Sequence, residues 1–213
     1  MKKSGRRFTF WMSFGLIVTV VAYTLFVKST SFESLLNWAQ INKLIFLASL
    51  IFVKALGIVW PPIPGGVLTL GSIPILGWQL AYFSDFLGSM IGSTVAYYLG
   101  RKYGIPFLKK ILSDEILEKV EKIKMKSNKE FEAIFFLRAF GGTVVEIIVY
   151  AAGLLKVNFV NFLSASVLSH LIFGIPGFYL TSNVISGENY VITLVSLGAL
   201  AFVFSKFKGR YFE

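Results

Sequence analysis

The sequence predicts an all-α polytopic membrane protein with about four transmembrane helices and two opposed re-entrant helical hairpins. Its composition is the first reason. Of the 213 residues, 55% are hydrophobic and only 15% are charged, and the mean hydropathy is +0.72, whereas a soluble domain usually has about 25% charged residues. The second reason is that two apolar segments are interrupted by helix-breaking residues. The third is the uneven distribution of Lys and Arg along the chain.

Composition also excludes several classes of function. The chain has no cysteine and one histidine, which excludes disulfides, thiolate metal sites and multi-histidine metal sites. Neither an HExxH nor a GxSxG motif is present, so we expect no enzymatic activity, no metal and no cofactor. The net charge of +10 does not indicate nucleic acid, because Lys and Arg in a membrane protein mostly report topology and contacts with anionic headgroups.

Four runs are predicted to cross the bilayer, which needs roughly 20 residues. Residues 1–30 form a cytoplasmic N-terminal segment and the first span, and residues 182–213 form the last span and a cytoplasmic tail. Between them, Ser31–Gln40 is expected to be a short interfacial helix with Ser31 as its N-cap. The four spans are Phe8–Val27, Trp78–Gly100, Phe159–Thr181 with a kink at Gly174–Gly177, and Tyr190–Ser205, which follows an outer loop from Ser182 to Asn189.

Two further apolar segments are broken in the middle. Proline lacks a backbone N–H and clashes with the preceding turn. Backbone groups freed inside a bilayer have to be buried in protein or line a cavity, so each broken segment is predicted to be a re-entrant hairpin. The first covers residues 41–76 and the second residues 131–155. The expected turn residues are Pro61, Pro62, Pro64, Gly65 and Gly66 in the first hairpin, and Gly141 and Gly142 in the second.

The basic residues support this layout. The three predicted cytoplasmic segments, which include a polar loop at residues 101–130, hold 16 of the 21 Lys and Arg residues, in agreement with the positive-inside rule. A hairpin followed by a span then occurs twice in residues 31–181, in opposite orientations, which is an inverted repeat. The small-xxx-small pattern Gly88–Ser93 allows close helix approach and permits a homo-oligomer.

The same segments resemble the DedA superfamily, also called the VTT-domain or SNARE-associated Golgi protein family. The resemblance covers roughly residues 54–181. A proline turn is followed by a GxxxG and YYLGRxxG pattern, and a later arginine precedes a YxAGL pattern. The matching positions are Gly92, Tyr97, Gly100, Arg101, Gly104, Arg138, Tyr150 and Gly153.

This resemblance implies lipid movement between leaflets, either scrambling of phospholipids or return of polyprenyl phosphate. The family pattern pairs acidic residues on the first hairpin with arginines on the second. Here Lys54 and Gly66 stand where acidic residues are usual, and Val144 stands at the second arginine. The branch without the acidic pair is therefore the closer match, and a Lys54–Glu146 pair is a possible charge swap.

The ionisable residues within apolar segments are the candidate site, because such groups are costly in a membrane. Arg138 is expected either to bind carbonyls freed at the second hairpin turn or to contact a phosphate headgroup. Glu146 either neutralises Arg138 or handles a proton or headgroup. Lys54 either snorkels to the interface or joins the site, and Asp85 is a possible partner for it. His170 is expected to be a satisfied interhelical histidine or a proton carrier.

The leading prediction is a lipid transporter or scramblase in the prokaryotic plasma membrane, with both termini in the cytoplasm and Arg138, Lys54, Glu146 and Asp85 as headgroup contacts. Its partners would be membrane lipids, phospholipid or polyprenyl phosphate, and no nucleic acid. Two alternatives remain open. One is a proton- or ion-coupled transporter of a small solute, and the other is a non-transporting membrane scaffold.

Overall fold

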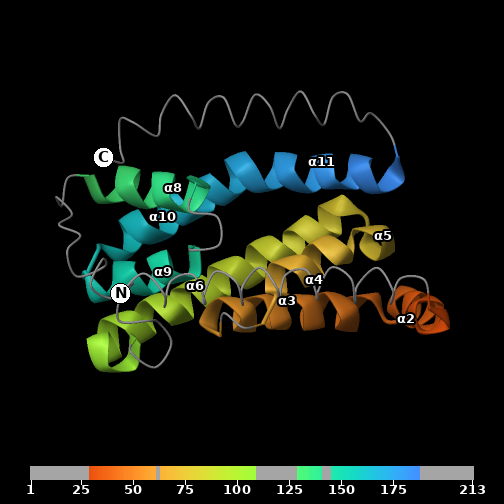
Figure 1. Cartoon of the computed structure of the whole chain (residues 1–213), viewed down its shortest axis with the longest axis horizontal. Coiled ribbons are helices and arrows are strands. Elements are labelled where there is room, and N and C mark those ends of the chain that lie inside the picture. The colour runs from red at the N-terminus through yellow and green to blue at the C-terminus, as the bar shows by residue number, and fades with distance from the viewer. Residues whose placement is uncertain (1–28, 61–62, 109–128, 141–144, 188–213) are drawn as a thin grey trace, which may run out of the picture. The chain divides into compact units, whose positions relative to one another are not determined.

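The computed structural model describes residues 29–60, 63–108, 129–140 and 145–187, and in these ranges it contains helices and no strand (Figure 1). The predicted all-α class is confirmed to that extent. The predicted first and last spans and most of the basic loop lie outside the described residues. The chain divides into two compact units, Met1–Phe46 and Leu47–Glu213, and each is described by itself.

In the first unit, helix α2 (Thr30–Ile41) buries Phe32 and Ala39. Its N-cap is Ser29, which makes no side-chain capping bond, so the prediction that Ser31 caps this helix was wrong. The serine that bonds within the first turn is Ser34, whose hydroxyl donates to the carbonyl of Thr30 at 3.2 Å. The helix begins one residue before the expected cap, and the backbone N–H of Phe32 bonds to the carbonyl of Ser29 at 3.0 Å.

The first apolar segment is interrupted where the prolines predict it. Helix α3 (Lys43–Val59) ends before the proline cluster, and α4 (Gly65–Gly71) begins after it. Pro61 and Pro62 lie outside the described residues. The arm after the turn is two short helices and not one, because α5 (Ile73–Leu76) starts afresh at Ser72 with Pro74 in its first turn, where a missing N–H costs nothing.

Helix α6 (Trp78–Leu108) is longer than the predicted span. The residues just past the predicted end of the span, from Arg101 to the break at Gly104, are also helical, and most of the predicted basic loop at residues 101–130 lies outside the described residues. Arg101 donates to the hydroxyl of Tyr97, one turn earlier, at 2.5 Å, so the charged group is accommodated on the helix surface. The helix is kinked at Gly104, where φ is 58° and ψ is −149°, a conformation that glycine adopts readily.

The second half begins with α8 (Glu130–Phe140) and α9 (Val145–Leu154), on either side of residues 141–144, which lie outside the described residues. Next come α10 (Phe159–Ser169), the π-helix η3 (His170–Gly174) and α11 (Ile175–Ser186). In Figure 1, α9 lies beside α6 and α8 lies beside α10, and these are the most extensive contacts in this unit. The core they enclose is centred on three fully buried rings, Tyr97, Tyr150 and Phe162.

The last described helices form one continuous segment, Phe159–Ser186. A π-helical turn, His170–Gly174, leads into the expected kink at residues 174–177, and the expected loop from Ser182 is helical up to Ser186, so the prediction of where that loop starts was wrong. Pro176 has no N–H to bond four residues back, and the wider turn just before it accommodates that loss. The helix ends at Gly187, whose φ is 74°.

By length and hydropathy, this 28-residue segment is one helix of the described part that could cross a membrane. A second is found only if the bent pair α2 and α3 is counted as a single span. Such a test alone is weak support for a membrane protein, since a buried helix of a soluble protein passes it too.

Glycines set the close approaches within the second unit, as the small-xxx-small pattern predicts. A Cβ on Gly92 would lie 2.6 Å from the carbonyl oxygen of Ala55, and one on Gly88 would lie 2.6 Å from Cβ of Lys54. On the other side of α6, Gly100 and Gly153 pack against the backbone carbonyls of Tyr150 and Tyr97. Helix α6 is therefore held between α3 and α9 with no room for larger side chains at these positions.

Candidate functional site

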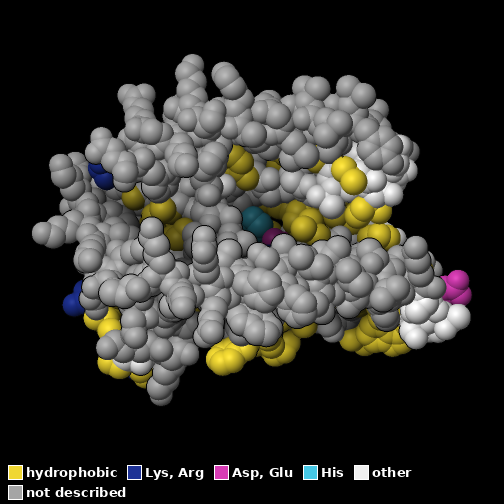
Figure 2. Space-filling model, in the orientation of Figure 1, with side chains coloured by type: hydrophobic (Ala, Val, Ile, Leu, Met, Phe, Trp, Pro, Cys, Tyr) yellow, Lys and Arg dark blue, Asp and Glu magenta, His cyan; other side chains and the backbone are white. Residues whose placement is uncertain are grey.

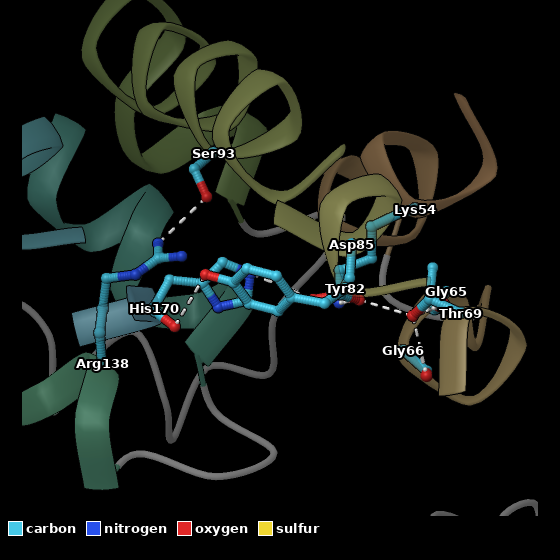
Figure 3. Close-up of polar contacts among 9 residues, drawn as sticks. All are labelled: Lys54, Gly65, Gly66, Thr69, Tyr82, Asp85, Ser93, Arg138 and His170. Atoms are coloured by element: carbon cyan, nitrogen blue, oxygen red, sulfur yellow. Dashed lines mark hydrogen bonds and ion pairs between the residues drawn. The ribbon is translucent and has the colours of Figure 1, made fainter. Parts of the chain in front are cut away.

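Asp85, on α6, is the centre of a buried charged cluster. Its side chain is 5% exposed, and Nζ of Lys54, on α3, lies 2.7 Å from Oδ1. The hydroxyl of Thr69, on α4, donates to the same oxygen at 2.5 Å (Figure 3). Three helices that are separate in sequence thus converge on one carboxylate. A buried charge is tolerated when it is paired and hydrogen-bonded, and Asp85 meets both conditions.

His170 approaches the other carboxylate oxygen. Its Nε2 lies 3.2 Å from Oδ2 of Asp85, and within the described residues Nε2 has no hydrogen-bond partner. The contact is therefore electrostatic and adds an attraction only when the imidazole is protonated. Phe86 stacks on the imidazole at 5.6 Å between ring centroids, and Tyr82 packs beside it.

The cluster lies among apolar side chains. Figure 2 shows a histidine side chain beside an acidic one, with yellow hydrophobic side chains on both sides of them. His170 begins the π-helix η3, and π turns inside α-helices are frequent at functional positions. The geometry places a carboxylate, an ammonium and an imidazole within contact distance of one another in a largely apolar setting.

Arg138 contacts α6 at Ser93, away from Asp85. Its guanidinium donates to Oγ of Ser93 at 3.1 Å, as Figure 3 shows. Ser93 and Asp85 are eight residues apart on α6, which is roughly 12 Å along a helix axis. The structure therefore brings Lys54, Asp85 and His170 together and places Arg138 two turns further along the same helix.

The predicted turn residues of the first hairpin border the cluster. A Cβ on Gly65 would lie 3.1 Å from Cα of Lys54, and one on Gly66 would lie 3.6 Å from its Nζ. Pro64 precedes α4 at the N-cap position. The absence of side chains at the two glycines lets α4 approach α3 closely enough for Thr69 to reach Asp85.

Glu146 belongs to α9, but its side chain lies outside the described part of the structure, as do Gly141 and Gly142. A Lys54–Glu146 pair therefore stays a prediction. Of the two partners considered for Lys54, Asp85 is the one that the structure places beside it.

Two tyrosines of the family pattern, Tyr97 on α6 and Tyr150 on α9, have packing roles. The hydroxyl of Tyr97 donates to the carbonyl of Val157 at 2.5 Å. The hydroxyl of Tyr150, on α9, donates to the carbonyl of Val59 at 2.7 Å. This second bond ties α9 to the last residue of α3, so the two interrupted segments are in direct contact.

Sequence reasoning missed Thr69, Ser93 and the aromatic residues around His170. A usable signal existed for Thr69, because it and Ser72 are the two polar residues in the otherwise apolar arm from Val67 to Leu76. Ser93 is one of several serines on α6, and nothing in its spacing singles it out as the partner of Arg138.

The fold and the site define a helical protein with charged groups buried among apolar side chains. A family model of the VTT domain matches residues 47–183, which is well over half of the chain. The chain therefore belongs to the VTT-domain family, the DedA and SNARE-associated Golgi family of membrane proteins. Its members are commonly regarded as transporters and are generally not enzymes. No curated protein and no solved structure gives a match.

Proposed function

We propose that this protein moves phosphate-bearing lipid headgroups, of phospholipid or polyprenyl phosphate, between the two leaflets of a membrane. The buried Lys54–Asp85–His170 cluster is the observation that carries the proposal. Ionisable groups within membrane segments are expensive and commonly mark the path of a substrate or ion. A polar headgroup that crosses the bilayer needs such a path, whereas its acyl chains do not.

The proposed architecture has two hairpins that enter from opposite faces, α3 with α4–α5 and α8 with α9, and it has α6 and α10–α11 among four spans. Helix lengths support it. At 1.5 Å per residue, the 11 residues of α8 and the 10 residues of α9 extend only about 16 Å each, short of the roughly 30 Å hydrocarbon core. The bond from Tyr150 to Val59 supports contact between the two hairpins.

In the proposed mechanism, a headgroup phosphate competes with Asp85 for the ammonium of Lys54. Phosphate and carboxylate both accept charge-assisted hydrogen bonds from an ammonium, and Asp85 would keep the hydrogen bond from Thr69 and the contact with His170 during the exchange. Arg138, two turns along α6, offers a second cation with a forked set of donors. A phosphate would thus pass from one cation to the other along α6 while its acyl chains remain in the surrounding lipid.

The test is reconstitution of the purified protein into liposomes that contain fluorescent phospholipid or fluorescent polyprenyl phosphate. We expect flux above that of empty vesicles, strongly reduced by Lys54→Gln. The matched control is Glu132→Gln, whose side chain is 54% exposed and 3.9 Å from Lys129. If the wild-type protein moves neither lipid faster than empty vesicles do, the proposal fails.

A second candidate function, a proton-coupled transporter of a small solute, is favoured by one observation. Nε2 of His170 faces Asp85 at 3.2 Å without a satisfied hydrogen bond in the described residues, an arrangement in which a proton could be gained or shared. Solute flux that follows a pH gradient and is lost in His170→Gln would favour it. Lipid flux unaffected by protonophores would argue against it.

A further inference from the structure

A second polar site lies away from the charged cluster. An open pocket of about 720 Å³ is lined by residues from three places: the later part of α6, the start of α8, and the connection from α9 into α10. This volume is within the range of pockets that bind small ligands, about 300–1,000 Å³. Figure 2 shows dark blue Lys and Arg side chains at separate places along the left edge of the molecule.

Two cations line this pocket, Arg101 and Lys156. One guanidinium nitrogen of Arg101 donates to the hydroxyl of Tyr97, which leaves most of its five N–H donors available. Both side chains are exposed. Within the described ranges, neither has a carboxylate at ion-pair distance.

The acidic residue of the pocket is already engaged by its wall. The carboxylate of Glu130 accepts one hydrogen bond from the backbone N–H of Asn158 and one from the side-chain amide of Asn161, both at 3.0 Å. These bonds hold the carboxylate against the start of α10. The described lining therefore carries two positive charges against one negative charge, and Oε2 of that carboxylate is already bonded to the wall of the pocket.

Lys156 occupies a position that normally favours glycine. Its φ is 56°. Its N–H bonds to the carbonyl of Gly153 and that of Val157 bonds to Ala152, both at 3.0 Å. This pattern is the Schellman ending of a helix, in which the residue with positive φ is usually glycine. A lysine at this position carries a conformational cost, and such costs are often found at functional positions. This points to a role for the charged side chain of Lys156.

The remaining lining is aromatic. Tyr98 and Phe159 lie with ring centroids 5.3 Å apart, and both contribute to the pocket. Aromatic rings beside cations are typical of the membrane interface, where one part of a ligand is apolar and the other hydrated. The N-terminus of α10 is already capped by Asn158, whose side chain accepts from Val160 and Asn161, so it offers little to an anion.

We propose that this pocket binds a phosphate group through Arg101 and Lys156, as a docking site for an anionic lipid headgroup at the end of the helical core. The choice of a lipid phosphate rests on the proposed function. A free phosphate shares the same chemistry, and the two sources are distinguished below. The site differs from the Lys54–Asp85–His170 cluster because it is open and has a net positive lining.

The test compares binding of dioleoyl phosphatidic acid with binding of dioleoylglycerol, which has the same chains without phosphate, to the purified full-length protein by native mass spectrometry. Lys156→Asn removes the charge and keeps a residue that tolerates positive φ. The control is Lys102→Gln, an exposed neighbour over the ring of Tyr103 that does not line the pocket. We expect Lys156→Asn to weaken phosphatidic acid binding about tenfold, as for loss of one charge-assisted hydrogen bond, and Lys102→Gln to leave it unchanged.

Equal affinity of wild type and Lys156→Asn for phosphatidic acid would overturn the inference, as would equal affinity of the wild type for the two lipids. Competition by inorganic phosphate would support a site for the phosphate alone, and lack of competition would support a site that also needs the acyl chains. Because the assay measures binding, binding without lipid flux would contradict only the proposed function. Lipid flux without selective binding would contradict only this inference.

Discussion

Nζ of Lys54 lies 2.7 Å from Oδ1 of Asp85, with the two side chains 15% and 5% exposed. The pair joins the helix that ends at the proline cluster to the long helix α6. A buried ion pair adds little net stability compared with a well-packed apolar pair, yet removal of one partner leaves an uncompensated charge. A comparison of single and double substitutions at Lys54 and Asp85 therefore separates a structural role of the pair from a functional one.

Asp85→Asn is expected to destabilise the protein strongly, by about 3–5 kcal/mol, because it leaves Lys54 without its anion. The double variant Lys54→Met/Asp85→Leu removes both charges and should be close to wild type in stability. The measurement is the midpoint of thermal unfolding in detergent. A double variant as unstable as Asp85→Asn would show that the two residues do not act as a pair.

Thr69→Val should destabilise the protein by about 1–2 kcal/mol, because it removes the hydroxyl that donates to Asp85 at 2.5 Å while keeping the side-chain shape. Ser164→Ala is the control, since Ser164 is exposed and, within the described part of the chain, its hydroxyl bonds to backbone carbonyls of its own helix. Equal unfolding midpoints for Thr69→Val and wild type would mean that the bond contributes nothing to stability.

Gly153→Ala should prevent normal packing of α9 on α6, because the new Cβ would overlap the carbonyl oxygen of Tyr97. We expect a large loss of folded protein on size-exclusion chromatography in detergent. Gly177→Ala provides a matched control, since among the described residues a Cβ there meets nothing within 4 Å and alanine is the better helix former by about 1 kcal/mol. Similar behaviour of the two variants would contradict the packing described for α6 and α9.

Tyr150→Phe removes the hydrogen bond that ties α9 to Val59 at the end of α3. Loss of one buried hydrogen bond should cost about 1 kcal/mol and should loosen the contact between the two interrupted segments. Hydrogen exchange at the end of α3 would report that loosening directly. Unchanged exchange there, with a lowered unfolding midpoint, would assign Tyr150 to general core packing.

Sequence patterns were sufficient to predict where α3 ends, because proline leaves few alternatives, and to predict close helix approach at Gly88 and Gly92. They did not predict that α11 continues to Ser186. There a local contact outweighs the local polarity, because the hydroxyl of Thr181 donates to the carbonyl of Gly177 at 2.8 Å. Helix ends depend on such contacts, which the pattern of apolar residues along the chain does not reveal.

For the site, single residues were easier to predict than their partners. Lys54 and Asp85 stand out as charges in apolar runs, and Asp85 was one of two partners considered for Lys54. Thr69 and Ser93 carry no such signal, because hydroxyl residues are common in membrane helices and often bond to their own backbone. The pairing of Arg138 with Ser93 depends on how α8 packs, which no local pattern encodes.

The most direct measurement of the central claim is the rate of fluorescent lipid movement in liposomes that contain the Lys54→Met/Asp85→Leu double variant, compared with wild type at equal reconstitution. This variant keeps an apolar, folded core and lacks the charged path. We predict that it folds like wild type and moves lipid no faster than empty vesicles do. Wild-type flux in the folded double variant would contradict the claim that the buried cluster serves headgroup movement.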